Sequence, residues 1–293
     1  MSKVWLITGS SRGLGRDLAK AVLAAGHRLV ATARKPEDLR ELVAEYGERV
    51  RAVALDVTDP AAARAAVAVA TSTFGRLDVV VNNAGYANVN SIEDVAEDDF
   101  RAQIDTNFFG VVNVTRAALP VLRAQREGHI IQISSIGGRL GSAGLAAYQS
   151  AKWAVGGFSE VLAKEVGPLG IRVTVVEPGG MRTDWAGSSM RIDEIRSDYR
   201  ATVGAMKAVH ENKDIGRGDP AKIARVIVRI ASEKEPPLRL VIGTDAAFLA
   251  GVVRELRAEE DAKWKELSMS TDFEGVVPFS ETPVADMFTR KKV

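Results

Sequence analysis

Residues 8–15 constrain the fold of this chain more than any other stretch. They read Thr-Gly-Ser-Ser-Arg-Gly-Leu-Gly, follow the short apolar run 4–7, and lead into apolar residues at helical spacing. The order strand, glycine turn, helix lets the backbone approach a pyrophosphate and points a helix N-terminus at its negative charge. An ordinary tight turn is the alternative. We favour a dinucleotide turn, because the strand and the helix are both present.

Apolar runs of strand length recur along the chain with helical stretches between them. Several are apolar nearly throughout, as expected for strands covered on both faces. The alternation predicts an α/β fold, a Rossmann-like doubly wound parallel sheet of seven strands with helices on both faces. The predicted strands lie at 4–7, 29–33, 50–55, 77–81, 130–133, 171–176 and 238–242. One catalytic domain is predicted over 1–245, with a C-terminal helix and tail over 246–293 packed on it.

Composition excludes several classes of function. A net charge of +1 gives no reason to expect a nucleic acid partner. The absence of cysteine excludes disulfides, thiol catalysis and cysteine metal sites. No apolar run approaches the ~20 residues of a membrane-spanning helix, and the first strand leaves no room for a secretory signal. A cytoplasmic protein without a metal or a membrane partner is expected.

The end of the second strand bears on the cofactor. An acidic residue there would bind the ribose 2′-hydroxyl of NAD, but the chain has Arg34 and Lys35 instead. With Arg12 in the glycine turn, these cations favour the 2′-phosphate of NADP through charge-assisted hydrogen bonds. The alternative is that they are solvated loop charges.

Polar residues also follow the third and fourth strands. Asp56 is a candidate contact for the adenine, or else a cap for the helix that starts near Pro60. Asn83 and Gly85 follow the fourth strand, where open α/β sheets bind ligands, although an asparagine turn is as good an explanation. Asn107 interrupts a long helical region over 95–125, where it is a tolerated irregularity or a functional position.

The candidate chemistry lies after the fifth strand. Ser135 closes that strand, and Tyr148 and Lys152 lie four positions apart on one face of the next helix. An ammonium near the phenol would lower its pKa from about 10 toward neutrality. Such a tyrosine can exchange the proton that accompanies hydride transfer at a carbonyl. A Tyr-Lys pair alone would be an ordinary surface pairing.

Together these motifs resemble the short-chain dehydrogenase/reductase family over residues 3–245. The resemblance implies a tetrad in which Tyr148 is the acid/base, Lys152 lowers its pKa and binds the nicotinamide ribose, Ser135 polarises the substrate oxygen, and Asn107 holds a water. It also implies these cofactor contacts besides Tyr148 and Lys152: Gly9, Ser11, Arg12, Gly13, Leu14, Gly15, Arg34, Asp56, Val57, Asn83, Ala84, Gly85, Pro178, Gly179 and Thr183. The sequence looks closest to the NADP-preferring branch with 17β-hydroxysteroid and retinol dehydrogenases.

Residues 181–219 are the predicted substrate lid. Their apolar face suits a small apolar carbonyl or alcohol, although the same residues could be core. Substrate contacts are expected from Ser135, Tyr148, Gly179, Trp185 and Met190. Family members are often dimers or tetramers, so a homo-oligomer is expected.

The predicted function is an NADP(H)-dependent oxidoreductase that interconverts a ketone or aldehyde and an alcohol, preferring NADP(H) to NAD(H). The alternative is a catalytically idle NADP-binding regulator or scaffold, which has no need of all four tetrad residues. An epimerase or dehydratase of the extended branch would use the same Tyr-Lys pair. The glycine spacing and the absence of a large C-terminal sugar domain disfavour it.

Overall fold

A computed structural model describes residues 2–182, 190–211 and 216–289. Its centre is a seven-stranded parallel sheet with the strand order β3-β2-β1-β4-β6-β7-β9. The strands are β1 (Val4–Ile7), β2 (Arg28–Ala33), β3 (Val50–Ala54), β4 (Val79–Asn82), β6 (Gly128–Ile133), β7 (Ile171–Pro178) and β9 (Arg239–Ile242). The predicted seven-stranded Rossmann-like sheet is confirmed, and each predicted strand matches one of these within a few residues.

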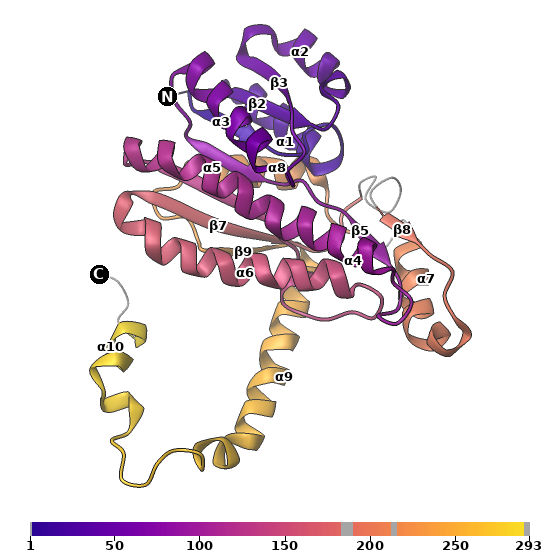
Figure 1. The fold of residues 1–293 in the computed structure, drawn as a ribbon, viewed down its shortest axis with the longest axis vertical. Helices are drawn as coiled ribbons and strands as arrows, with labels where there is room; N and C mark the ends of the chain where they lie inside the picture. Colours follow the sequence, from indigo (N-terminus) through magenta and orange to yellow (C-terminus); the bar gives the residue numbers. More distant parts are fainter. Residues whose placement is uncertain (1, 183–189, 212–215, 290–293) are drawn as a thin grey trace. The chain divides into compact units, whose positions relative to one another are not determined.

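Helices cover both faces of the sheet (Figure 1). The helices that contribute to the two apolar clusters of the sheet are α1 (Gly13–Ala24), α2 (Arg40–Tyr46), α3 (Pro60–Phe74), α5 (Gly110–Gln125), α6 (Ala146–Val166) and α8 (Pro220–Ile230). The other helices of the chain are α4 (Glu97–Ile104), α7 (Ala205–Glu211), α9 (Thr244–Met269) and α10 (Pro283–Thr289). Asp59 caps α3 by accepting the amide of Ala61 at 2.7 Å. The residue that caps α3 is therefore Asp59 and not Asp56, which the sequence analysis considered for this role.

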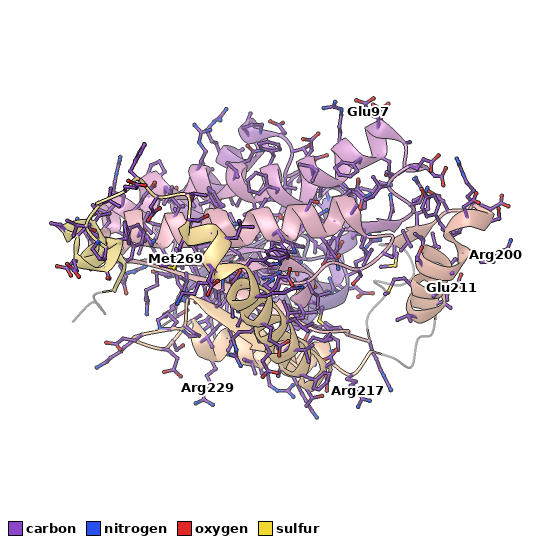
Figure 2. All side chains as sticks on the ribbon, turned by 90° about the horizontal axis from the view of Figure 1, so that it is seen from below. Glu97, Arg200, Glu211, Arg217, Arg229 and Met269 are labelled. Atoms are coloured by element: carbon purple, nitrogen blue, oxygen red, sulfur yellow. The ribbon has the colours of Figure 1, made fainter. Side chains whose placement is uncertain are left out.

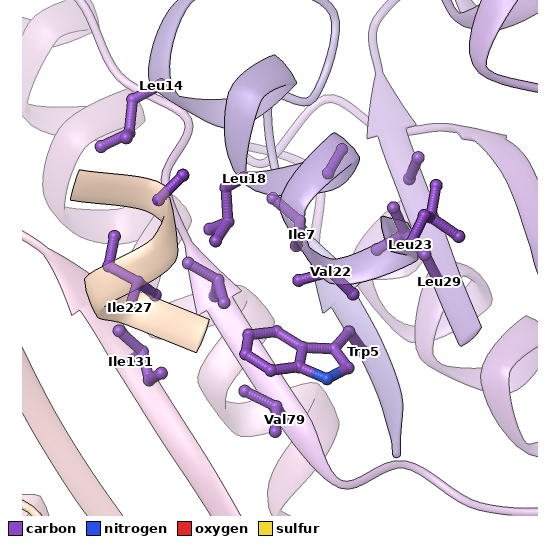
Figure 3. Packing of buried hydrophobic residues seen from close by; sticks show 14 of the residues in the cluster. Trp5, Ile7, Leu14, Leu18, Val22, Leu23, Leu29, Val79, Ile131 and Ile227 are labelled. Carbon is purple, nitrogen blue, oxygen red and sulfur yellow. The ribbon is translucent and has the colours of Figure 1, made fainter. Parts of the chain in front are cut away.

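The two faces of the sheet contribute to two separate apolar clusters. In β1, Trp5 and Ile7 join the cluster beneath α1 and α8, whereas Val4 and Leu6 join the cluster beneath α3, α5 and α6. Figure 3 shows the first cluster, with Ile227 of α8 beside the β1 side chains. Full burial of an aliphatic side chain contributes about 1.5–3 kcal/mol, so strands apolar on both faces stabilise this sandwich.

The predicted helical region over 95–125 is broken in its middle. Between α4 and α5, residues Asp105–Phe109 form one turn of π-helix that contains Asn107. Such turns occur mostly as single bulges inside helices and frequently at functional sites. The irregularity expected at Asn107 is therefore a local change from α-helix to π-helix.

Part of the lid is held against the body by a second, two-stranded sheet. Strand β8 (Met190–Ile192) pairs in parallel with β5 (Ala87–Val89). At the base of the lid, Met181 forms a bridge with Gly218. Arg200 and Glu211, labelled in Figure 2, bound a further turn of π-helix and α7. The two described limbs of the lid therefore meet at its base.

The chain divides into two compact units, residues 1–250 and residues 251–293. The second unit holds most of α9 and the short α10, and its large apolar side chains are exposed, Phe273, Phe279 and Met287 among them. The predicted packing of 246–293 on the catalytic domain stays a prediction. Within the described ranges, no helix has the length and apolar character needed to cross a membrane.

Candidate active site

The candidate site lies along one edge of the main sheet. Strands β1, β4, β6 and β7 are successive neighbours and all parallel, so their carboxyl ends meet at the same edge. The glycine turn follows β1, Asn83 follows β4, Ser135 follows β6 shortly after its end, and Gly179 follows β7. The sheet order thus brings together motifs that are far apart in the sequence.

The turn after β1 requires its glycines. Gly9 and Gly13 have φ values of +68° and +53°, a left-handed conformation that disfavours other residues. A Cβ on Gly15 would stand 2.1 Å from the carbonyl oxygen of Gly9, so the first turn of α1 lies directly against the loop. No acidic residue lies in that first turn and no side chain caps it. The amides at the start of α1 can therefore face an anion.

Asn83 holds this turn in place. Its Nδ2 donates to the carbonyl oxygens of Thr8 at 2.9 Å and Gly9 at 3.1 Å. In return, the hydroxyl of Thr8 accepts the backbone amides of Asn83 and Ala84, both at 2.9 Å. The side chain of Asn83 thus shapes the cofactor turn, and its role at the edge of the sheet is more than that of an isolated asparagine turn.

The basic residues expected at the ribose follow the second strand, and their contact with a cofactor stays a prediction. Arg34 is exposed directly after β2. Hydrogen bonds from the backbone amide and the hydroxyl of Thr58 lower the pKa of Asp56, and the positive charge of Arg34 lowers it further. Asp56 therefore stays ionised near Arg34, at the end of the sheet where an adenosine would lie.

Leu14 and Val57 place their side chains in the core. They are 6% and 7% exposed and belong to the two clusters that cover the sheet. Val57 packs against α5 so tightly that a Cβ on Gly110 would stand 2.5 Å from its Cγ2. Only the backbone of these two residues is left to contact a cofactor.

Ser135, Tyr148 and Lys152 come together beside the end of β6. The hydroxyl of Ser135 is hydrogen-bonded to the phenol of Tyr148. Lys152 donates from Nζ to the carbonyl oxygen of Ile133 at 2.8 Å, and this Nζ lies 5.5 Å from the centre of the Tyr148 ring. Both Tyr148 and Lys152 are buried in the first turns of α6.

Asn107 reaches the same place from the π-helical turn. Its Nδ2 donates to the carbonyl oxygens of Gln103 and Tyr86, both at 2.8 Å, and its Oδ1 accepts the amide of Tyr86 at 3.2 Å. A Cβ on Gly85 would stand 2.5 Å from Asn107 Oδ1 and 3.6 Å from Lys152 Nζ. The structure thus brings all four predicted tetrad residues to one site.

The expected pKa of the phenol needs correction. Burial raises the pKa of Tyr148 to about 12, against the lowering effect of its hydrogen bond with Ser135. Burial also lowers the pKa of Lys152 to about 8. The prediction of a pKa lowered toward neutrality is therefore wrong, because burial of the phenol raises its pKa by more than the hydrogen bond with Ser135 lowers it.

After β7, an acidic residue that the sequence analysis missed lies against the strand end. Gly179 donates its amide to Ile242 at 2.9 Å, and Gly180 donates to Asp245 Oδ2 at 2.8 Å. A Cβ on Gly179 would stand 2.3 Å from either carboxylate oxygen of Asp245. Thr183 and Trp185 lie outside the described residues.

An apolar cluster includes Tyr148. Its buried members are Ala87, Val89, Leu145, Tyr148, Met190 and Val203, with Ile192, Ile195 and Tyr199 packed against it. The lid therefore supplies Met190 and Val203 to the surroundings of Tyr148. In the described part of the chain, no group of three or more His, Cys, Asp or Glu residues could hold a metal ion.

Comparisons with known proteins agree with this geometry. Residues 3–193 match the family model described as short chain dehydrogenase. The chain belongs to this family. It is also 54% identical over 273 residues to the oxidoreductase BOA17 of Botryotinia fuckeliana, a match that spans 92% of this chain and 100% of the relative. The chain is therefore an NAD(P)-dependent dehydrogenase or reductase of the short-chain family.

Solved structures show the same fold. A short-chain dehydrogenase from Streptomyces avermitilis superposes with a TM-score of 0.87 at 40% identity, covering 93% of this chain and 99% of that one. An alcohol dehydrogenase from Thermococcus sibiricus, complexed with 5-hydroxy-NADP, gives 0.69 at 26% identity, covering 83% and 96%. A 3-ketoacyl-(acyl-carrier-protein) reductase from Brucella melitensis, complexed with NADH, gives 0.70 at 26% identity, covering 82% and 96%. A nicotinamide cofactor is thus supported.

Proposed function

We propose that this oxidoreductase interconverts a ketone or aldehyde and an alcohol with NADP(H), using Tyr148 as the acid/base. The observation that carries the proposal is the grouping of Ser135 with the buried Tyr148 and Lys152 at the carboxyl edge of the sheet, where the glycine turn after β1 also lies. A bound nicotinamide supplies or accepts the hydride. The remaining roles belong to residues of the chain.

The glycine turn and the start of α1 would hold the pyrophosphate, and Arg34 with Arg12 would bind the 2′-phosphate. Asp56 would meet the adenosine. Lys152 would hold the nicotinamide ribose, and Gly179 with Thr183 would place the carboxamide. Preference for NADP(H) over NAD(H) rests on the basic residues after β2 and on the absence of an acid there.

Tyr148 would donate the proton in carbonyl reduction. A phenol whose pKa burial raises to about 12 stays protonated at neutral pH, which suits a proton donor. Ser135, already hydrogen-bonded to the phenol, would polarise the carbonyl oxygen. The nearby ammonium of Lys152 would stabilise the phenolate left behind.

The apolar cluster around Tyr148 supports a small apolar carbonyl substrate. With residues 181–219 as the lid, Met190 and Val203 would cover the substrate and exclude water. A homo-oligomer and a cytoplasmic location stay predictions.

A carbonyl panel with NADPH tests the proposal. We expect loss of NADPH absorbance with apolar ketones or aldehydes, and much slower loss with charged ones of similar size. NADPH binding without turnover of any carbonyl or alcohol in the panel would contradict the proposal and favour the idle regulator. The variant Ser135→Ala, which removes the hydroxyl proposed to polarise the carbonyl together with the acceptor for the amide of Gly137, should lose most of this turnover.

A further inference from the structure

Gln149, the residue directly after Tyr148, contacts the loop that follows Ser135. Gln149 is 6% exposed. Its Oε1 accepts the backbone amide of Ser142 at 2.6 Å. Its amide group also lies against the preceding turn, since a Cβ on Gly137 would stand 3.0 Å from Nε2 and 3.2 Å from Cγ of Gln149. One side chain of α6 thus contacts both ends of the segment from Gly137 to Ser142.

The contacted turn holds the hydroxyl of Ser135 from one side. Gly137 donates its amide to Ser135 Oγ at 3.0 Å, and Gly138 donates its amide to the Ser135 carbonyl oxygen at 2.9 Å. A Cβ on Gly138 would stand 2.8 Å from Ser134 Oγ and 3.0 Å from the carbonyl oxygen of Lys152. The turn therefore rests directly on α6, with no space for side chains between them.

The amide of Gly137 occupies one of the two acceptor positions of the Ser135 hydroxyl. A hydroxyl has one proton and two lone pairs. With one lone pair of Ser135 Oγ accepting from Gly137, the hydroxyl orients so that its proton is available to Tyr148. The hydrogen bond between Ser135 and Tyr148 acts to lower the pKa of the phenol, as a bond donated to the phenolate does.

We propose that Gln149 is a positioning residue for the acid/base: by bracing the Gly137–Ser142 segment on α6, it keeps the Ser135 hydroxyl donating to Tyr148. The inference rests on the proposed function of Tyr148. Gln149 itself does not reach the reacting atoms in this account. It acts through Gly137 and Ser135.

The test replaces Gln149 by methionine, which has a similar shape but lacks the amide acceptor. We expect the pH dependence of alcohol oxidation to shift upward by roughly half to one pH unit, as loss of one hydrogen bond to the phenolate implies. The KM for NADP should stay unchanged. Ser142→Ala, which keeps the backbone amide that Gln149 uses, should leave the profile unchanged.

A second variant approaches the same contact from the other side. Gly137→Ala crowds the amide of Gln149 without requiring a left-handed backbone, and it should shift the profile in the same direction. At least one of the two variants is expected to fold. If the pH dependence of alcohol oxidation is unchanged in a folded variant, even one with a lower melting temperature, Gln149 has a purely structural role and the proposal is overturned.

A ¹³C NMR measurement tests the positioning role of Gln149 independently of the proposed reaction. With ¹³C at the ζ carbon of tyrosine, the Tyr148 signal is identified by its loss in Tyr148→Phe. Gln149→Met should move that signal and Ser142→Ala should not, whether or not any carbonyl is turned over. An unmoved signal in Gln149→Met would overturn the positioning role. Failure of the wild type to turn over the carbonyl panel would instead contradict the proposed function alone.

Discussion

Lys152 places its ammonium 5.5 Å from the centre of the Tyr148 ring and donates from it to the carbonyl oxygen of Ile133 at 2.8 Å. Both side chains are buried. The lysine therefore adds positive charge to the site where a phenolate would form, but at a cost in folding free energy.

Replacing Lys152 by methionine should raise stability while abolishing turnover. Burial lowers the pKa of Lys152 from its usual 10.5 to about 8, so below pH 8 folding desolvates a charged ammonium at a cost of about 3 kcal/mol. Chemical denaturation at pH 7 should show Lys152→Met more stable than the wild type. The difference should shrink as the pH rises from 8 to 10.5, because in this range the folded chain carries a neutral lysine while the unfolded chain still binds the proton, and it should vanish above pH 10.5, where both are neutral. A variant less stable than the wild type at pH 7 would contradict this.

Arg34→Asp should exchange the cofactor preference. The variant loses a charge-assisted hydrogen bond to the 2′-phosphate and adds a repulsive carboxylate, so NADPH binding should weaken by roughly 10- to 100-fold. NADH binding should change far less. Arg64→Asp, an equal change of charge on an exposed position of α3, is the matched control. Titration of both cofactors measures this, and equal losses for NADPH and NADH would remove Arg34 from the phosphate site.

Glu177→Gln should destabilise the strand that leads to Gly179. Glu177 is fully buried at the end of β7, where it accepts from Arg139 Nε at 2.9 Å and from Arg239 Nη1 at 2.6 Å. Removing its charge leaves two guanidinium groups partly unpaired, which costs about 3–5 kcal/mol.

The neighbouring pair provides the control for Glu177. Glu160 contacts Arg239 Nε at 2.7 Å but is half-exposed, at 49%. Urea denaturation should therefore show a loss below about 1 kcal/mol for Glu160→Gln. Similar losses in the two variants would mean that burial of Glu177 does not set the cost.

Much of the fold could be predicted because its signals are local and repeated. The apolar runs and the glycine turn define the parallel sheet, and the tetrad residues stand at strand and helix positions that the sheet order brings together. The β5–β8 pair could not be predicted. Its strands are three residues each and about a hundred residues apart. Such short segments are too short to show the periodic pattern by which strands are predicted.

The pKa values and several contacts of the site could not be predicted from the sequence either. The pKa of Tyr148 depends on its burial, which residue spacing does not report, and the apolar cluster that includes Tyr148 draws on segments far apart in the chain. The side chain of Asn83 proved to brace the glycine turn, and this needs the adjacency of β1 and β4. Asp245 gives no signal of its own, because its partner Gly180 is 65 residues away.

The most direct test of the central claim is the rate of NADPH-dependent carbonyl reduction by Tyr148→Phe, measured beside its NADPH affinity. Loss of the phenolic proton donor should lower the rate by about 10²- to 10⁴-fold, with the dissociation constant for NADPH changed by less than about threefold, because the pyrophosphate and 2′-phosphate contacts remain. A variant that binds NADPH and reduces the same carbonyl at the wild-type rate would contradict the role of Tyr148 as the acid/base.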